Sequence, residues 1–150
     1  MAEHRIPQFQ WNSLSYLTAR AGRIGTQELT ELMESESLTR HHFTIICALE
    51  EFGGISQNDL AARSNLNRGH LVAYLDQLST RGILERNVDP EDRRRNLITL
   101  TAAGRKFAAR AMAAAEHSEA KVFDALDAQQ QVQLRTLLQL VAAQDGEAQQ

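Results

Sequence analysis

Three consecutive arginines, Arg93 to Arg95, form the stretch of this sequence whose residue types most directly indicate chemistry. They follow Asp89 and Pro90, two turn-forming residues, in VDPEDRRRNLITLT (residues 88–101). Adjacent guanidinium groups repel one another, so a folded core has no use for them, whereas a polyanion binds them through its phosphates. We therefore interpret this loop as a binding element for a polyanion, the alternative being an ordinary solvated face.

The surrounding charge supports the same interpretation. The chain of 150 residues has a formal charge of -3. The segment from Arg63 to Arg110, however, contains ten Arg or Lys residues and only five Asp or Glu residues. A basic segment inside an acidic chain is typical of nucleic-acid binding.

Other classes of protein find little support. The sequence has no metal-protease helix motif, no phosphate-binding glycine loop and no nucleophile elbow, so we expect neither an enzyme nor a cofactor. Cys47 is the single cysteine, which excludes an intrachain disulfide and fits a reducing compartment. No run of about 18 apolar residues and no signal-like N-terminus occurs, so we expect no membrane association and a cytoplasmic protein at the nucleoid.

The elements that must position the arginines are mostly helical, with one small β-hairpin. Only Pro7 and Pro90 interrupt a sequence rich in Ala, Leu, Gln and Glu. Apolar periodicity and capping residues predict six helices. They are expected from near 8 to near 35, from Thr39 to Gly53, from about 57 to 63, from about 68 to Gly82, after Thr101, and after Asp127.

The middle of the chain has a recognisable order of elements. A short helix opens at Ser56, and after the turn SNLN a second helix begins near Arg68 with Asn67 as its cap. A hairpin follows, with strands at ILERNV and NLITL and the arginine-rich loop as its tip. This order predicts a winged helix-turn-helix, in which a helix enters the major groove of DNA and the wing reaches the minor groove.

The segment LAARSNLNRGHLVAYLDQLSTRGILERNVDPEDRRRNLITLTAAG, residues 60–104, resembles the signature region of the MarR family of regulators, and LVAYLDQL is particularly similar to its SlyA branch. The resemblance implies one MarR-type domain over residues 1–150. Its dimerisation helices would lie at about 8–35 and 101–145, and its winged helix-turn-helix at about 38–100. It also implies a homodimer on a pseudo-palindromic, double-stranded DNA operator, acting as a repressor that a small aromatic, phenolic or carboxylate ligand releases.

DNA-contacting residues are expected on two elements. On the recognition helix they are Asn67, Arg68, His70, Val72 and Ala73, with Arg68 and His70 in the first turn and the two apolar residues near thymine methyl groups. In the wing we expect Arg94 in the minor groove, Arg93 and Arg95 on phosphates, and Asp92 holding the loop and orienting an arginine. Gly69 and Ala73 depart from common family residues, so the operator sequence does not carry over.

A ligand pocket is a further implication of the resemblance. The residues that would line it are Arg23, His41, His42, Cys47 and Tyr74. Surface histidines, a packed tyrosine and a buried, inert thiol are the plain alternatives. Two other functions stay open: a winged-helix module that binds protein and not DNA, and a metal- or redox-responsive regulator. Adjacent His41 and His42 point about 100 degrees apart on a helix, which disfavours shared chelation.

Overall fold

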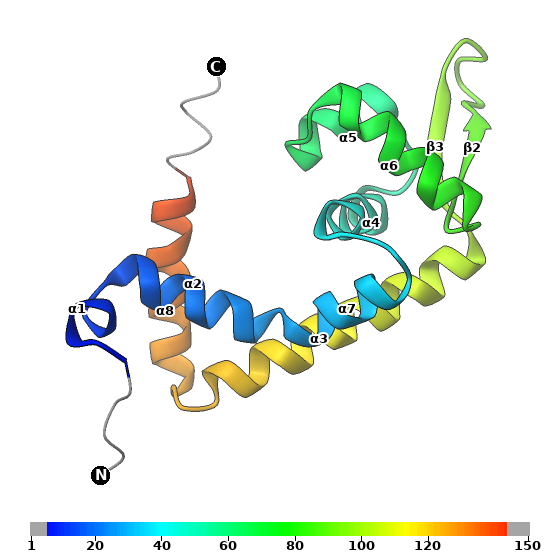
Figure 1. Ribbon diagram of the computed structural model, residues 1–150. Coiled ribbons are helices and arrows are strands. Elements are labelled where there is room, and N and C mark those ends of the chain that lie inside the picture. Colours follow the sequence, from blue (N-terminus) through cyan, green and yellow to red (C-terminus); the bar gives the residue numbers. More distant parts are fainter. Residues whose placement is uncertain (1–5, 144–150) are drawn as a thin grey trace. The chain divides into compact units, whose positions relative to one another are not determined.

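The computed structural model describes residues 6–143, and these form two compact units, residues 26–116 and residues 6–25 with 117–143 (Figure 1). The described residues contain eight helices and three strands: α1 (Gln8–Trp11), α2 (Leu14–Gly25), α3 (Gln27–Ser35), α4 (Arg40–Phe52), β1 (Ile55–Ser56), α5 (Gln57–Ser64), α6 (Arg68–Thr80), β2 (Leu84–Val88), β3 (Asn96–Leu100), α7 (Ala102–Phe123) and α8 (Ala128–Ala142). This confirms the predicted mostly helical fold with a small wing.

The unit at residues 26–116 holds the hydrophobic core. Leucines spaced along α6 meet isoleucines of α4 and the strands, and α7 contributes small residues that allow close approach. The side chains that are most completely buried there are Met33, Ile45, Ile46, Leu60, Leu71, Leu75, Leu78, Leu84 and Ile98. The core therefore backs both helices of the helix-turn-helix and the base of the wing.

The wing is an antiparallel sheet with the strand order β1-β3-β2. Strands β2 and β3 pair from Leu84 opposite Leu100 to Val88 opposite Asn96, as the predicted hairpin requires. Strand β1 adds Ser56 opposite Leu97. Our prediction of two strands missed β1, because two residues carry no alternation that a sequence pattern can reveal.

The predicted first helix is interrupted, which corrects the expected six helices to eight. Ser13 Oγ accepts a hydrogen bond from the Tyr16 amide at 3.3 Å and starts α2 after a break. Gly25 then ends α2, and Thr26 adopts a non-helical backbone before α3. A capping serine and a glycine each offer the backbone an alternative to the helix, so the apolar residues expected on one helix are divided among three shorter ones.

Most predicted helix boundaries are confirmed by side-chain caps. Ser56 Oγ accepts from the Asp59 amide, Asn67 Oδ1 from the Gly69 amide, and Asp127 with Gln130 forms a capping box. Gly82, after α6, has a φ of 67°, the left-handed backbone that favours glycine at this position. The chain thus encodes the limits of its helices locally.

The other unit contains α1, α2, the end of α7 and α8, and its described apolar side chains stay unburied. Large ones are strongly exposed along it: Phe9, Leu14, Val132, Leu137, Leu140 and Val141. In the described part of the chain, no helix is long and apolar enough to cross a membrane. An apolar surface of this kind normally marks an interaction site.

The start of α7 meets the end of α6 at a crowded junction. Thr101 Oγ1 donates to the Gly82 carbonyl at 2.5 Å and accepts from the Gly104 amide at 2.9 Å. A Cβ placed on Gly104 would lie 1.8 Å from the Ile83 carbonyl oxygen. The glycine is therefore required by the close approach of two backbones.

Replacing Gly104 by alanine should lower the free energy of unfolding by about 2 kcal/mol, because backbone must move to accept the methyl group. Without the clash, replacing a helical glycine by alanine would raise the free energy of unfolding by about 0.5–1 kcal/mol. The sign of the measured change therefore shows whether the clash is present. Urea unfolding measures the change, with Ala103→Ser on the exposed side of the same turn as the control. Equal or higher stability of Gly104→Ala would contradict the close approach.

Candidate DNA-binding interface

The recognition helix α6 has one buried and one exposed face. Leu71, Leu75 and Leu78 are fully buried, while Arg68 and His70 are exposed in its first turn. Val72, which is 42% exposed, and Ala73 share the solvent side. The predicted base-contacting residues of α6 are thus all accessible to solvent.

Asn67, which was predicted to contact DNA, is the N-cap of α6. Its side-chain oxygen accepts from the Gly69 amide at 2.8 Å and so caps α6. The turn before it contains Asn65, whose left-handed backbone (φ 51°) ends α5. The amide group of Asn67 keeps its donor hydrogens, so this residue can donate to DNA but has its acceptor engaged.

The loop of the wing is shaped by two aspartates. Asp89, which is buried, accepts from the Glu91 amide at 2.9 Å, and its own amide donates to the Arg95 carbonyl at 2.9 Å. Asp92 accepts from the Arg94 amide at 3.0 Å. Asp92 thus orders the loop by bonding to a backbone amide and not by the expected bond to an arginine side chain, and Asp89 forms the turn that its residue type predicts.

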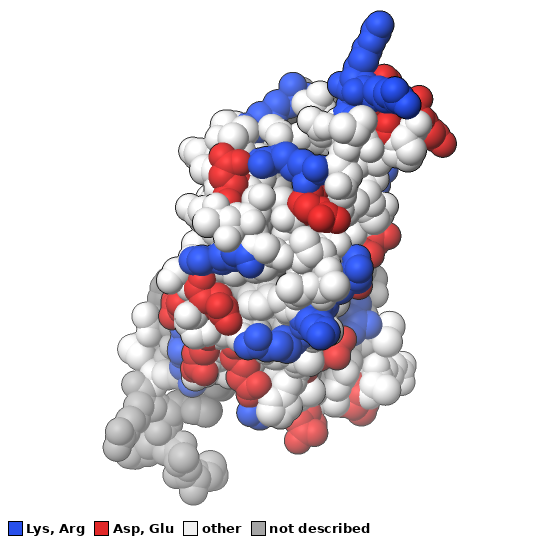
Figure 2. Space-filling model, turned by 90° about the vertical axis from the view of Figure 1, so that its right-hand side faces the viewer, with Lys and Arg blue, Asp and Glu red and all other residues white. Residues whose placement is uncertain are grey.

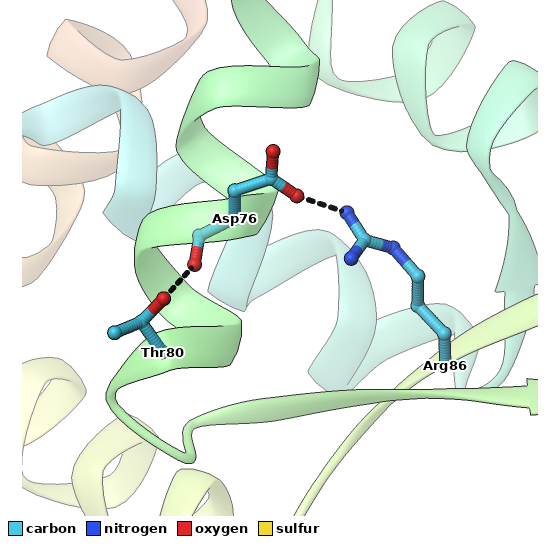
Figure 3. Close-up of polar contacts among 3 residues, drawn as sticks. All are labelled: Asp76, Thr80 and Arg86. Atoms are coloured by element: carbon cyan, nitrogen blue, oxygen red, sulfur yellow. Dashed lines mark hydrogen bonds and ion pairs between the residues drawn. The ribbon is translucent and has the colours of Figure 1, made fainter.

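An ion pair connects the recognition helix to the wing. Arg86 of β2 donates from Nη2 to Asp76 Oδ1 of α6 at 2.7 Å, and Thr80 Oγ1 donates to the Asp76 carbonyl at 2.8 Å (Figure 3). The two charged side chains keep 35% and 60% of their surface exposed, so the pair contributes at most about 1 kcal/mol to stability. Its effect is geometric, since it ties β2 to α6.

Basic side chains gather where the wing lies. Figure 2 shows Lys and Arg side chains projecting at the top of this face, at the height where Figure 1 places the β2–β3 hairpin, with acidic side chains beside them. Arg93, Arg94 and Arg95 are all exposed. Arg95 forms an ion pair with Asp59 of α5, with Nη2 at 3.5 Å from Oδ2. The positive charge of this surface is therefore partly compensated.

Three of the residues that were expected to line a ligand pocket lie together. His41 stacks on Tyr74 with ring centroids 5.4 Å apart, and His42 meets the same ring edge-on at 4.9 Å. Cys47 on the same helix is half-buried, and burial raises the pKa of its thiol. Arg23 belongs to the other unit. Among residues 6–143, no three His, Cys, Asp or Glu side chains gather as a metal site would need.

His42 is a buried structural residue and not a surface histidine. The Thr39 amide donates to its Nδ1 at 2.9 Å, so Nε2 carries the proton and donates to Gln77 Oε1 of α6 at 2.7 Å. Burial lowers the pKa of His42, and the nearby Arg81 and His41 act in the same direction. Neutral His42 thus joins the start of α4 to α6.

Short helix, turn, recognition helix and hairpin, arranged on one core, define the class of winged helix-turn-helix proteins. Residues 38–95 match the family model described as MarR family. HTH-type transcriptional repressor Rv2887 of Mycobacterium tuberculosis is 29% identical over 126 residues, which cover 84% of this chain and 91% of that protein. Together with the fold, these matches show that residues 38–95 carry the MarR family pattern, in a chain that is similar to a named transcriptional repressor over most of its length.

Solved structures agree with this assignment. CouR, a transcriptional repressor bound to a 23-mer DNA duplex, superposes with a TM-score of 0.73 at 27% identity, covering 90% of this chain and 96% of that one. The structure of CouR from Rhodococcus jostii RHA1 bound to p-coumaroyl-CoA has a TM-score of 0.73 and 26% sequence identity, covering 91% of this chain and 96% of that one. BpsR of Bordetella bronchiseptica has a TM-score of 0.71 and 25% sequence identity, covering 91% of this chain and 98% of that one. The DNA binding of BpsR is regulated by 6-hydroxynicotinic acid.

The stability of the protein should fall in mildly acidic solution because of His42. Since folding lowers the pKa of this group, the unfolded chain binds its proton first. The contribution of neutral His42 is complete above about pH 6.5 and is lost as pH falls toward the lowered folded pKa. Urea unfolding measured between about pH 7.5 and 5 should show this loss.

Glutamine at position 42 can still serve a capping box, so His42→Gln should flatten this pH dependence. His41→Gln is the matched control on the same helix and should leave the dependence in place. An unchanged pH dependence in His42→Gln would mean that another group titrates.

Proposed function

We propose that this protein is a sequence-specific DNA-binding transcriptional repressor that acts as a homodimer in the cytoplasm, at the nucleoid, without a catalytic step. The observation that carries the proposal is the exposure of Arg68 and His70 in the first turn of α6, a helix that its buried leucines anchor to the core and that a wing with exposed arginines follows. Relatives named as repressors, and a similar structure bound to a DNA duplex, support it.

The contacts divide between base reading and backbone neutralisation. Arg68 can pair with a guanine edge in the major groove, His70 can donate to a base or a phosphate, and Val72 with Ala73 fits thymine methyl groups. In the wing, Arg94 is proposed for the minor groove, where the potential is most negative, and Arg93 for a phosphate. A two-fold dimer would place two such surfaces on half-sites about 10 bp apart.

Selection of bound fragments from genomic DNA with the purified protein tests the function directly. We expect enrichment of a pseudo-palindromic sequence, which would also identify the regulated gene. Failure to enrich any such sequence, with binding that hardly responds to salt, would instead favour a protein-interaction module.

Arg68→Ala and Arg93→Ala should weaken binding in different ways. Losing Arg68 should reduce the preference for the operator over unrelated DNA by about 1–3 kcal/mol. Losing Arg93 should weaken binding to all sequences alike and reduce the slope of log affinity against log salt by about 0.9 for each contacting wing. Fluorescence anisotropy at several salt concentrations measures both effects.

Arg110 of α7 offers a control, because it is not one of the residues proposed to contact DNA. Its Nη2 lies 3.9 Å from Oε1 of Glu36. Arg110→Ala should leave both the operator preference and the salt slope unchanged. If Arg68→Ala kept the full preference, the assignment of the α6 surface to base reading would be wrong.

The proposed dimer rests on the exposed apolar residues of the unit that contains α1, α2 and α8. On α8, Leu137, Leu140 and Val141 keep 61%, 65% and 66% of their surface exposed in the single chain. A second copy can bury them by two-fold symmetry, which is the common arrangement in oligomers. Homodimerisation through this unit would also set the spacing of the two α6 helices.

Leu137→Glu should raise the dimer dissociation constant at least about 100-fold, which corresponds to about 2.7 kcal/mol, because a charge would enter the apolar contact. Gln139→Glu introduces the same charge on the opposite side of α8 and should leave the dimer intact. Sedimentation equilibrium distinguishes the two. A stable dimer of Leu137→Glu would place the interface elsewhere.

We further propose that a small aromatic, phenolic or carboxylate effector releases the protein from its operator. CouR binding p-coumaroyl-CoA and BpsR responding to 6-hydroxynicotinic acid support this class of ligand. His41 and Tyr74, stacked beside the buried His42, provide aromatic groups of suitable chemistry, with Cys47 on the same helix as a further proposed contact. A role of Arg23 stays a prediction from the family resemblance, because this residue belongs to the other unit. A 100-fold loss of operator affinity would require about 2.7 kcal/mol of coupling.

A further inference from the structure

Four arginines belong to the wing, and they differ in their acidic partners. Arg86 pairs with Asp76 at 2.7 Å and Arg95 pairs with Asp59 at 3.5 Å. Within residues 6–143, Arg93 and Arg94 have no carboxylate within ion-pair distance. The partners of the first two arginines come from the two helices of the helix-turn-helix, α6 and α5.

The pairing of Asp59 with Arg95 follows from the sheet. Ser56 of β1 lies opposite Leu97 of β3, two residues after Arg95, so the first turn of α5 is brought beside the loop end of β3. Ser56 Oγ donates to Asp59 Oδ2 at 2.6 Å and fixes the carboxylate. The strand that sequence analysis missed therefore places this acid.

The backbone of Arg95 is also fixed. Its amide donates to the Asp92 carbonyl and its carbonyl accepts from the Asp89 amide, each at 2.9 Å. Arg95 is held by its backbone and Asp59 by its bond to Ser56, so the two side chains are already in contact in the free protein. Each keeps about half of its surface exposed. An exposed pair of this kind contributes little to folding, so its consequence lies in charge.

We propose that Asp59 is a positioning residue that retains Arg95 against α5 and cancels its charge, so that each wing presents two effective arginines, Arg93 and Arg94, to DNA. This inference rests on the proposed DNA binding. Moving Arg95 to a phosphate would leave the Asp59 carboxylate uncompensated beside a polyanion, so the exchange gains little. In this proposal Arg95 stays paired with Asp59 and does not make the phosphate contact that the sequence predicted.

The salt dependence of DNA binding separates the two roles. The wild-type protein and its variants are titrated with a short random-sequence duplex by fluorescence anisotropy over a range of NaCl concentrations. Asp59→Asn keeps an acceptor for Ser56 but frees Arg95. Its salt slope should steepen by about 0.9 per contacting wing, and its affinity at 0.15 M salt should rise roughly fivefold per wing.

The charge-neutral double variant Asp59→Asn with Arg95→Gln is decisive. It should keep the wild-type salt slope, because it removes one charge of each sign. A slope lower by about 0.9 per wing in the double variant, or an Asp59→Asn variant indistinguishable from wild type, would overturn the proposal. Arg95→Gln alone exposes the Asp59 charge and so weakens binding under either role.

Arg93→Gln serves as the reference for a true phosphate contact and should lower the slope. Thermal unfolding of each variant checks that α5 is still capped. If the wild-type protein showed no salt-dependent DNA binding, the proposed function itself would fail. A salt-dependent wild type with an altered double variant would reject only the holding role of Asp59.

Discussion

Burial of three leucines on α6 is the constraint on which the DNA-binding surface depends. Leu71, Leu75 and Leu78 are each completely enclosed by the core, so the helix cannot rotate about its axis without exposing them. The remaining surface of the helix is thereby committed to solvent, with Arg68 exposed at its N-terminal end and His70, Val72 and Ala73 exposed on the sides that point away from the leucines. Base reading by this helix would thus be specified by apolar packing on its far side.

Polar contacts then connect the neighbouring elements to this fixed helix. His42 joins the start of α4 to Gln77, and Arg86 joins β2 to Asp76. One contact is buried and requires a neutral histidine, while the other is exposed and ionic. The helix is therefore held on one side by a bond that acid weakens and on the other by a bond that salt weakens.

The sequence predicts features that are encoded within a few residues. Capping by Ser56, Asn67 and Asp127 and the left-handed Gly82 are confirmed because each depends on a local backbone and side-chain geometry. The interruptions of the first helix were missed, although Gly25 gave a local signal. A long apolar stripe conceals short breaks.

Contacts between distant segments could not be predicted in this way. His42 and Gln77 are 35 residues apart, and Asp59 reaches Arg95 only after β1 has paired with β3. The exposure of Arg68 and His70 was foreseen from their position in the first turn of α6. Their roles toward DNA remain proposals, since position on a surface does not by itself define a contact.

The junction of Thr101, Gly82 and Gly104 has a mechanical consequence. Because Gly104 has no side chain, backbone meets backbone there, and no flexible group can absorb a change of angle. Helix α7 has 22 residues and is about 33 Å long. Its first turn is therefore seated by direct backbone contact, so the direction in which this long helix leaves the core is set by main-chain geometry and not by the choice of a side chain.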